Sequence, residues 1–300
     1  MTTPHLSRLA FFTLLAVACL FGANHVAARF AFNNGLDVAS AVAVRSLATA
    51  VVVSLLVLWQ GVPLTLSPRQ RRAMLLIGVL VSIQSLCLYS AVARLPVALA
   101  LLAFNTYPLW TAFWDWVIHR RVPERRVLIA MPVILFGLGL ALDVLGAASG
   151  LGAAAQWGRI GVGVAFALTS AAVFGVALVV TQHEVAALDG RLRTAITMTL
   201  VGLLALVAVA GQGGLHLPHN PAGWWGLLAL TLFYGTAFTI MFTLLPRLGV
   251  VGSSPIMNVE PVAALGLAWL LLGQSIAPLQ LMGAVLVVGA VMALGLRRRR

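Results

Sequence analysis

The feature that most constrains this chain is a series of ten apolar stretches, each about 20 residues long, which is the length a helix needs to cross a bilayer. Hydrophobic residues make up 61% of the chain and charged residues 9%, against roughly a quarter charged in a soluble domain. We therefore predict an all-α, polytopic membrane protein with ten transmembrane helices. The predicted spans are Leu9–Ala31, Val38–Trp59, Ala73–Ala93, Val97–Ile118, Val127–Leu145, Ile160–Gln182, Thr194–Gly211, Trp224–Leu245, Val251–Leu272 and Pro278–Leu296.

The basic residues indicate how these helices are oriented. The net charge is +12, and all 19 basic residues are arginines. If the N-terminus is inside the cell, most arginines fall on the cytoplasmic side, so the positive-inside bias predicts that both termini are cytoplasmic. We read this charge as a topology signal and expect no nucleic-acid partner, while the tail Arg297–Arg300 could contact anionic membrane lipid.

The chain repeats itself at an offset of 153 residues. Matches among Gly, Pro, Asn, Arg and Trp are hard to obtain by chance in so apolar a chain. They pair Phe21-Gly22 with Phe174-Gly175, Arg94-Leu95 with Arg247-Leu248, Asn105 with Asn258, Pro108 with Pro261, and Trp116 with Trp269.

Each repeat holds five predicted spans, and an odd number forces the second repeat to enter the membrane from the opposite side. We therefore predict two inverted five-helix repeats, an arrangement that recurs in secondary transporters. Residues 1–147 form the first repeat, 148–158 a Gly/Ala-rich connection that reads as flexible, and 159–300 the second repeat.

Three features carry a resemblance to a known family: the ten-helix twofold layout, Phe21-Gly22 with its counterpart Phe174-Gly175, and Pro108 with Pro261. In these features the chain resembles the drug/metabolite transporter superfamily of the type with two EamA domains. The resemblance implies a bacterial inner-membrane exporter of amino acids and related metabolites. It also implies a central cavity lined by the first, third and fourth helices of each repeat. The family usually ends its fourth helix with Gly-Glu, whereas this chain has Gly273-Gln274 and Arg120-Arg121, so no gating contact is inferred from those positions.

Polar side chains near the middle of the bilayer are costly and usually face a cavity or a partner. At 1.5 Å per residue, several of them lie about 12 to 17 Å from the entry of their own span, close to the half-thickness of the hydrocarbon core. The candidate substrate-binding residues are Tyr107, Glu260, Gln84, Asn105, Asn258, Ser170 and Tyr234, together with the aromatic Trp110.

The sharpest signal is the pair of tetrads Asn105-Thr106-Tyr107-Pro108 and Asn258-Val259-Glu260-Pro261. A proline inside a helix removes one backbone hydrogen bond and kinks the helix. Pro108 and Pro261 are therefore candidate kink or gating residues, or prolines that the membrane helices simply tolerate. Glu260 could bind a cationic group, carry a coupling proton, or make a structural hydrogen bond between helices.

We expect structural roles for the other ionisable residues. We expect His25 to bond between helices, Arg29 and Arg45 to extend toward the membrane surface or pair with Asp37, and Asp115 to pair with Arg120 or Arg121. His216 and His219 have a metal-like spacing but no further ligands nearby. We therefore predict no metal site and no cofactor.

Three classes of function remain to be compared. An embedded enzyme is disfavoured, because a chain without lysine has no phosphate-loop lysine or Schiff base and no hydrolase motif is present. The same absence argues against ATP-driven transport. We predict a secondary transporter of a small molecule, monomeric or homodimeric, with a channel or a passive scaffold as the alternative.

Overall fold

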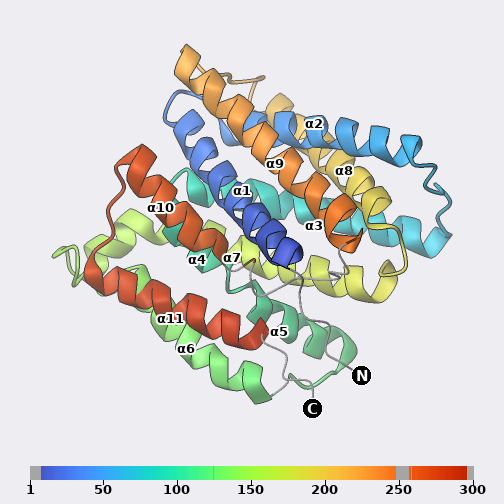
Figure 1. The fold of residues 1–300 in the computed structure, drawn as a ribbon. Helices are drawn as coiled ribbons and strands as arrows, with labels where there is room; N and C mark the ends of the chain where they lie inside the picture. Colours follow the sequence, from blue (N-terminus) through green and yellow to red (C-terminus); the bar gives the residue numbers. More distant parts are fainter. Residues whose placement is uncertain (1–7, 124, 248–256, 258, 296–300) are drawn as a thin grey trace.

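A computed structural model describes residues 8–123, 125–247, 257 and 259–295 of the chain. In this described part the chain is helical and contains no strand (Figure 1). The helices are α1 (Arg8–Phe32), α2 (Val38–Trp59), α3 (Pro68–Val92), α4 (Val97–Phe104), α5 (Tyr107–His119), α6 (Arg125–Ala141), α7 (Ala153–Glu184), α8 (Gly190–Gly211), α9 (Pro221–Arg247), α10 (Glu260–Leu272) and α11 (Pro278–Gly295).

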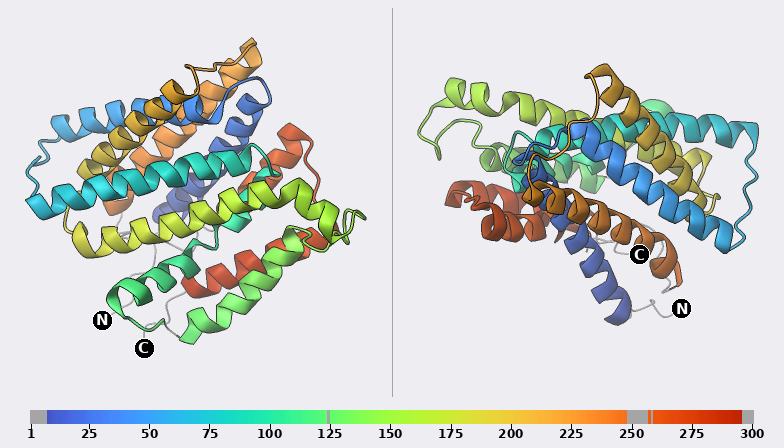
Figure 2. Two further views of the ribbon diagram at one scale, coloured as in Figure 1. Left: turned by 180° about the vertical axis from the view of Figure 1, so that it is seen from behind. Right: turned by 90° about the horizontal axis from the view of Figure 1, so that it is seen from above.

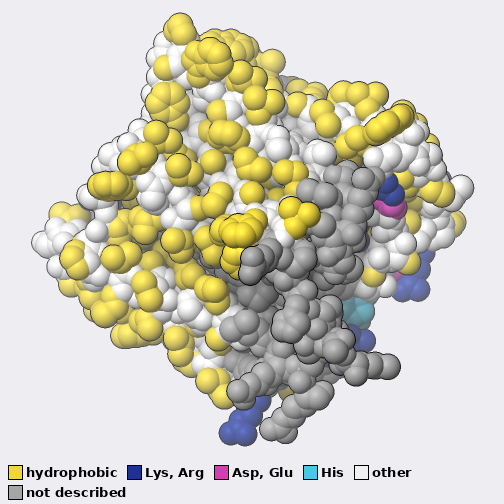
Figure 3. Space-filling model, in the orientation of Figure 1, with side chains coloured by type: hydrophobic (Ala, Val, Ile, Leu, Met, Phe, Trp, Pro, Cys, Tyr) yellow, Lys and Arg dark blue, Asp and Glu magenta, His cyan; other side chains and the backbone are white. Residues whose placement is uncertain are grey.

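The lengths and surfaces of the helices fit a bilayer. Among the described residues, seven spans are long and apolar enough to cross it, one of them formed by α4 and α5 together, and α6, α10 and α11 are shorter apolar helices. Hydrophobic side chains are spread over the left and upper part of the face in Figure 3, while the charged and histidine side chains seen there lie along its right and lower edges. The chain is a multi-pass membrane protein, and the number of crossing helices stays a prediction.

Short polar signals in the sequence set several helix ends. Ser67 caps α3 through a capping box with Gln70, and Pro68 follows in the first turn. Asp37 and Asp189 cap α2 and α8, the second helices of the two halves. α7 begins at Ala153, so residues 153–158 of the expected flexible connection are helical, because alanines favour a helix.

The helices pack with an approximate twofold symmetry (Figures 1 and 2). At the 153-residue offset, α1, α2, α3, the α4 and α5 pair, and α6 correspond to α7, α8, α9, α10 and α11. The contact of α1 with α9 is matched by that of α7 with α3, and the contact of α1 with α10 by that of α7 with α5. α2 packs against α8, and α6 against α11, so each of these helices meets its own counterpart.

Two equivalent glycines explain the Phe-Gly matches in the sequence. A Cβ atom on Gly22 of α1 would lie 2.9 Å from the carbonyl oxygen of Glu260 in α10. A Cβ atom on Gly175 of α7 would lie 2.8 Å from the backbone nitrogen of Thr111 in α5. Both distances are too short for any side chain, so glycine is what lets each helix pair approach this closely.

The ends of α5 and α10 also correspond. Arg120 ends α5 with φ 59°, and Gly273 ends α10 with φ 64°. Gln274, where the related family usually has glutamate, accepts a hydrogen bond of 3.0 Å from the backbone N–H of Val97. Gln274 therefore caps the start of α4, a task that needs only a side-chain oxygen.

Candidate functional site: a buried polar cluster at the contact of α1 and α10

Polar side chains from five helices gather beside the contact of α1 with α10. We name this group the polar cluster. Its members are Asn24 and His25 of α1, Arg45 of α2, Tyr89 of α3, Tyr234 of α9 and Glu260 of α10. Most of these side chains are buried, so the cluster is a polar island within an apolar bundle, where unsatisfied groups are costly.

Arg45 is the most unusual member of the cluster. It is only 2% exposed, and its guanidinium carbon lies 4.3 Å from the ring centroid of Tyr89 and 3.9 Å from that of Tyr234. These aromatic faces stabilise the cation. Yet Nε and Nη1 of Arg45 have no hydrogen-bond partner among the described residues. A buried cation with free donors is suited to receive an anionic group from a ligand.

His25 and Glu260 bring opposite chemistry to the same place. Nε2 of His25 lies 3.3 Å from Oε1 of Glu260, and the imidazole ring lies 5.5 Å from that of Tyr89. Nδ1 of His25 has no partner among the described residues. The pair joins α1 to α10 and leaves one ring nitrogen of His25 open inside the bundle.

Asn24 and Tyr89 connect the two parts of the cluster. The hydroxyl of Tyr89 donates to Oδ1 of Asn24 at 2.9 Å, while Nδ2 of Asn24 has no partner in the part of the chain described. Tyr234 donates to the sulfur of Met198 at 3.5 Å. Together with Arg45, Asn24 thus leaves free N–H donors inside the bundle.

The structure distributes the predicted site residues over separate places. Glu260 and Tyr234 lie in the polar cluster. Gln84 and Ser170 bond to each other instead: Nε2 of Gln84 lies 3.4 Å from Oγ of Ser170, which donates to the backbone oxygen of Gln84 at 3.0 Å. This exchange joins α3 to α7 and satisfies both side chains in large part.

Tyr107, the repeat counterpart of Glu260, belongs to an aromatic group at the contact of α5 with α7. Its ring lies 5.5 Å from that of Phe104 and 5.3 Å from that of Phe174. Trp110 follows one turn later, and its carbonyl carbon and its Cβ would each lie 2.9 Å from a Cβ atom added to Gly175. The linings next to the two equivalent glycines therefore differ: ionisable and aromatic side chains lie near Gly22, and aromatic side chains lie near Gly175.

Asn105 and Thr106 interrupt the fourth predicted span directly ahead of Pro108. α4 ends at Phe104, Asn105 is its C-cap, and α5 restarts with Pro108 in its first turn. Pro261 occupies the same place in the first turn of α10. Asn258 lies outside the described residues.

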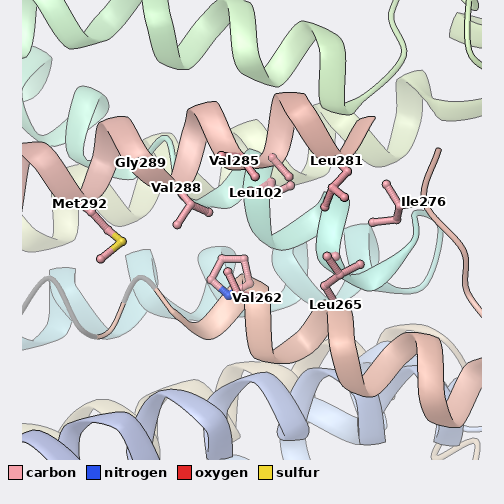
Figure 4. Close-up of a pocket in the computed structure, with 12 residues that line it drawn as sticks. Leu102, Val262, Leu265, Ile276, Leu281, Val285, Val288, Gly289 and Met292 are labelled. Atoms are coloured by element: carbon pink, nitrogen blue, oxygen red, sulfur yellow. The ribbon is translucent and has the colours of Figure 1, made fainter. Parts of the chain in front are cut away.

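Pro261 also lines a cavity of about 300 Å³ between α4, α10 and α11. Figure 4 shows Val285 and Val288 of α11 facing Val262 and Leu265 of α10 across this space. Every side chain that lines the cavity is apolar. The cavity is therefore suited to an apolar group such as a hydrocarbon chain, and it is separate from the polar cluster.

Several ionisable residues have other partners than the sequence led us to expect. Arg45 neither reaches the surface nor pairs with Asp37, because two tyrosines hold it inside. Arg29 donates from Nη1 to the backbone oxygen of Val92 at 2.8 Å. Asp115 faces His119 and His183 at 3.1 and 3.7 Å, so its predicted pairing with the neighbouring arginines is wrong.

Asp37 lies between α1 and α2 and serves as a cap. Burial alone would raise its pKa, but hydrogen bonds from Ser40, Gln212 and the N–H of Ala39 outweigh burial and hold the pKa of Asp37 below its usual value. The carboxylate therefore remains charged at neutral pH and fixes the start of α2.

Sequence comparison decides the family. The profile of the EamA-like transporter family matches residues 8–142 and matches again over 161–296. The chain belongs to the EamA-like transporter family. The two matches cover both halves of the twofold packing, so the EamA-like protein has a two-repeat architecture, and the resemblance stated from the sequence is confirmed.

The other comparisons concern fold and near relatives. A solved structure described only as "Crystal structure of protein" is similar to the EamA-like chain with a TM-score of 0.62 and 16% sequence identity. The alignment covers 95% of this chain and 96% of the other, which supports the fold over nearly the whole length. No curated protein matches this chain.

Proposed function

We propose that this EamA-like protein is a secondary transporter that exports small metabolites such as amino acids across a bacterial inner membrane. The family makes it a transporter of small molecules, and the polar cluster supports a substrate with charged groups. Transport would proceed by alternating access, with the two repeats inverted and both termini in the cytoplasm. The arginine distribution supports that orientation.

The observation that carries the proposal is the buried guanidinium of Arg45 with its free N–H groups. A carboxylate is the group that best satisfies such donors. Glu260, held by His25 at 3.3 Å, supplies negative charge from α10 in the same cluster and would accept an ammonium group. Amino acids carry both groups, so they fit this pair of charges.

The remaining candidate residues take supporting roles in this proposal. Gln84, Ser170, Asn105 and Asn258 would supply amide and hydroxyl contacts, and Tyr107, Tyr234 and Trp110 aromatic walls. The interruption at Asn105 and Thr106 supports Pro108, and by repeat equivalence Pro261, as joints that bend during the transport cycle.

The proposal is tested with purified protein in liposomes. Labelled amino acids are placed outside vesicles loaded with the same unlabelled compounds, and exchange is measured without a net gradient. Saturable counterflow that requires substrate on both sides supports alternating access. Ion currents far above the turnover of a carrier would instead establish a channel, and the absence of any flux for carboxylate-bearing and amine-bearing metabolites would reject the substrate class.

A further inference from the structure

Three metal-ligating side chains meet at the charged end of the bundle, outside the polar cluster. Asp115 and His119 lie one turn apart on α5, and His183 lies near the end of α7. One ligand atom from each can be chosen so that all three lie within 4.8 Å of one another. The side chains are 21 to 29% exposed, so water and ions can reach them.

The distances fit a tetrahedral metal ion. Oδ1 of Asp115 lies 3.1 Å from Nδ1 of His119 and 3.7 Å from Nε2 of His183. Zinc bonds of about 2.0 to 2.1 Å place neighbouring ligand atoms of a tetrahedron roughly 3.3 Å apart. The two measured separations lie on either side of this value.

The hydrogen bonding of His183 directs its other ring nitrogen toward Asp115. Nδ1 of His183 lies 2.9 Å from the backbone oxygen of Val179, and because a carbonyl oxygen only accepts, Nδ1 donates to it. Nε2 is then the ring nitrogen that lies 3.7 Å from Oδ1 of Asp115 and is available as a ligand. Metal-bound imidazoles commonly donate their other N–H to a backbone carbonyl in this way.

The other two ligand atoms are also without satisfactory partners. Oδ1 of Asp115 and Nδ1 of His119 are buried atoms that make no hydrogen bond of acceptable geometry with described residues. The rings of His119 and His183 stack with centroids 3.7 Å apart and an interplanar angle of 13°. An imidazole binds a metal ion in the plane of its ring, so one of the two rings has to turn out of this stack before both can bind the same ion.

We propose that Asp115, His119 and His183 bind a divalent transition-metal ion of the zinc type, with a fourth position left to water. Two imidazoles and one carboxylate are a ligand set that zinc accepts. The ion would join α5 to α7, helices of different repeats. The equivalent positions at the 153-residue offset are Ala268, Leu272 and Phe30, so the site occurs once per chain.

The expectation of no metal site considered only His216 and His219. Those residues follow α8 in the loop before α9, and Nδ1 of His216 lies 3.3 Å from Nε2 of Gln212. The set formed by Asp115, His119 and His183 was not predicted, because its third member comes from a helix distant in sequence.

The test uses the purified full-length protein in detergent after treatment with a chelator. Zinc chloride is titrated by calorimetry, and cobalt is substituted to record visible absorption. We expect one equivalent of zinc per chain and the intense cobalt bands of a tetrahedral site. His183→Gln and Asp115→Asn should each weaken binding by about tenfold or more, in line with changes around other metal sites, and His216→Ala should leave it unchanged.

Thermal unfolding with and without zinc supplies a second measurement, because an ion that binds only the folded chain raises its unfolding temperature. The rise should occur in the parent chain and in His216→Ala, and disappear in His183→Gln. If a variant fails to fold, the cobalt spectrum of the parent chain alone still decides. No tetrahedral cobalt bands, or zinc binding equal in His183→Gln and the parent, would overturn the proposal and leave the three side chains as an ion-pairing cluster without a metal.

Discussion

The contact of α1 with α10 and the contact of α7 with α5 have equivalent backbone packing but carry different side chains. In both, a glycine allows the close approach, Gly22 in one and Gly175 in the other. Beside the first lie His25, Glu260 and the guanidinium of Arg45. Beside the second lie aromatic rings. Different residues therefore determine packing and chemical character in this protein. The glycines determine how closely the helices pack, and the neighbouring side chains determine the chemical character of each contact.

Arg45→Met would introduce the residue found at the repeat counterpart, Met198. It would remove the buried positive charge that most distinguishes the first contact from the second. We expect transport of carboxylate-bearing substrates at low concentration to fall about 100-fold, because hydrogen bonds to charged groups contribute about 1.5 to 3 kcal/mol each. Uptake into proteoliposomes measures the effect. Arg159→Met, at an exposed position of α7, is the matched control, and equal transport by the two variants would contradict the role of Arg45.

The next largest effect is expected from the two glycines that allow the close helix contacts. Gly22→Ala and Gly175→Ala should each lower the free energy of unfolding by roughly 1 to 3 kcal/mol, because the added Cβ meets backbone atoms that must move apart. Gly139→Ala in α6, with open space around its Cβ, should have a small effect. Thermal unfolding compares the three, and a loss confined to one half would show that the contacts are not equivalent.

Glu260→Gln keeps the shape of the side chain and removes its charge. We expect net transport to fall about tenfold, since charge-assisted hydrogen bonds are roughly twice as strong as neutral ones. Counterflow should survive if Glu260 carries a proton and fail if it binds the substrate. Glu184→Gln, which removes an acid that pairs with Arg69 at the charged end, is the control. Normal net transport and counterflow at equal expression would leave Glu260 as a packing residue.

The smallest effect is expected at the ends of α5 and α10, which share a left-handed backbone conformation but differ in the residue that adopts it. Arg120 has a left-handed conformation that its counterpart Gly273 adopts more easily. Arg120→Gly should therefore raise the free energy of unfolding by up to about 1 kcal/mol. Gly273→Ala should lower it by a similar amount. Unchanged unfolding in both variants would mean that these helix ends do not contribute to stability.

The sequence was enough to predict an all-helical membrane fold, the two-repeat layout and the family, because apolar length and matched Gly and Pro residues depend on local chemistry. It was not enough to predict which polar residues meet. Depth was counted at 1.5 Å per residue along each span, and this selected Gln84 and Ser170, which mainly bond to each other. It passed over Arg45 and Tyr89, because these residues lie outside the depth near the midplane that the count selected.

A signal for Arg45 was nevertheless present. An arginine inside an apolar span is costly and by default indicates a functional site. We assigned it to the membrane surface because long side chains can extend outward. The structure holds it between two aromatic rings instead, and no local pattern in the sequence links these three residues, since they come from α2, α3 and α9.

The unlike linings of the two glycine contacts have a consequence for the energetics of the transport cycle. If the protein alternates between two end states as proposed, identical halves would make those states equivalent by the twofold axis and equal in free energy, and the empty protein would populate them equally. A charged pair and a buried arginine beside one glycine contact, against aromatic rings beside the other, would make the two states unequal. The resting preference of the empty carrier would thus depend on which lining has to open.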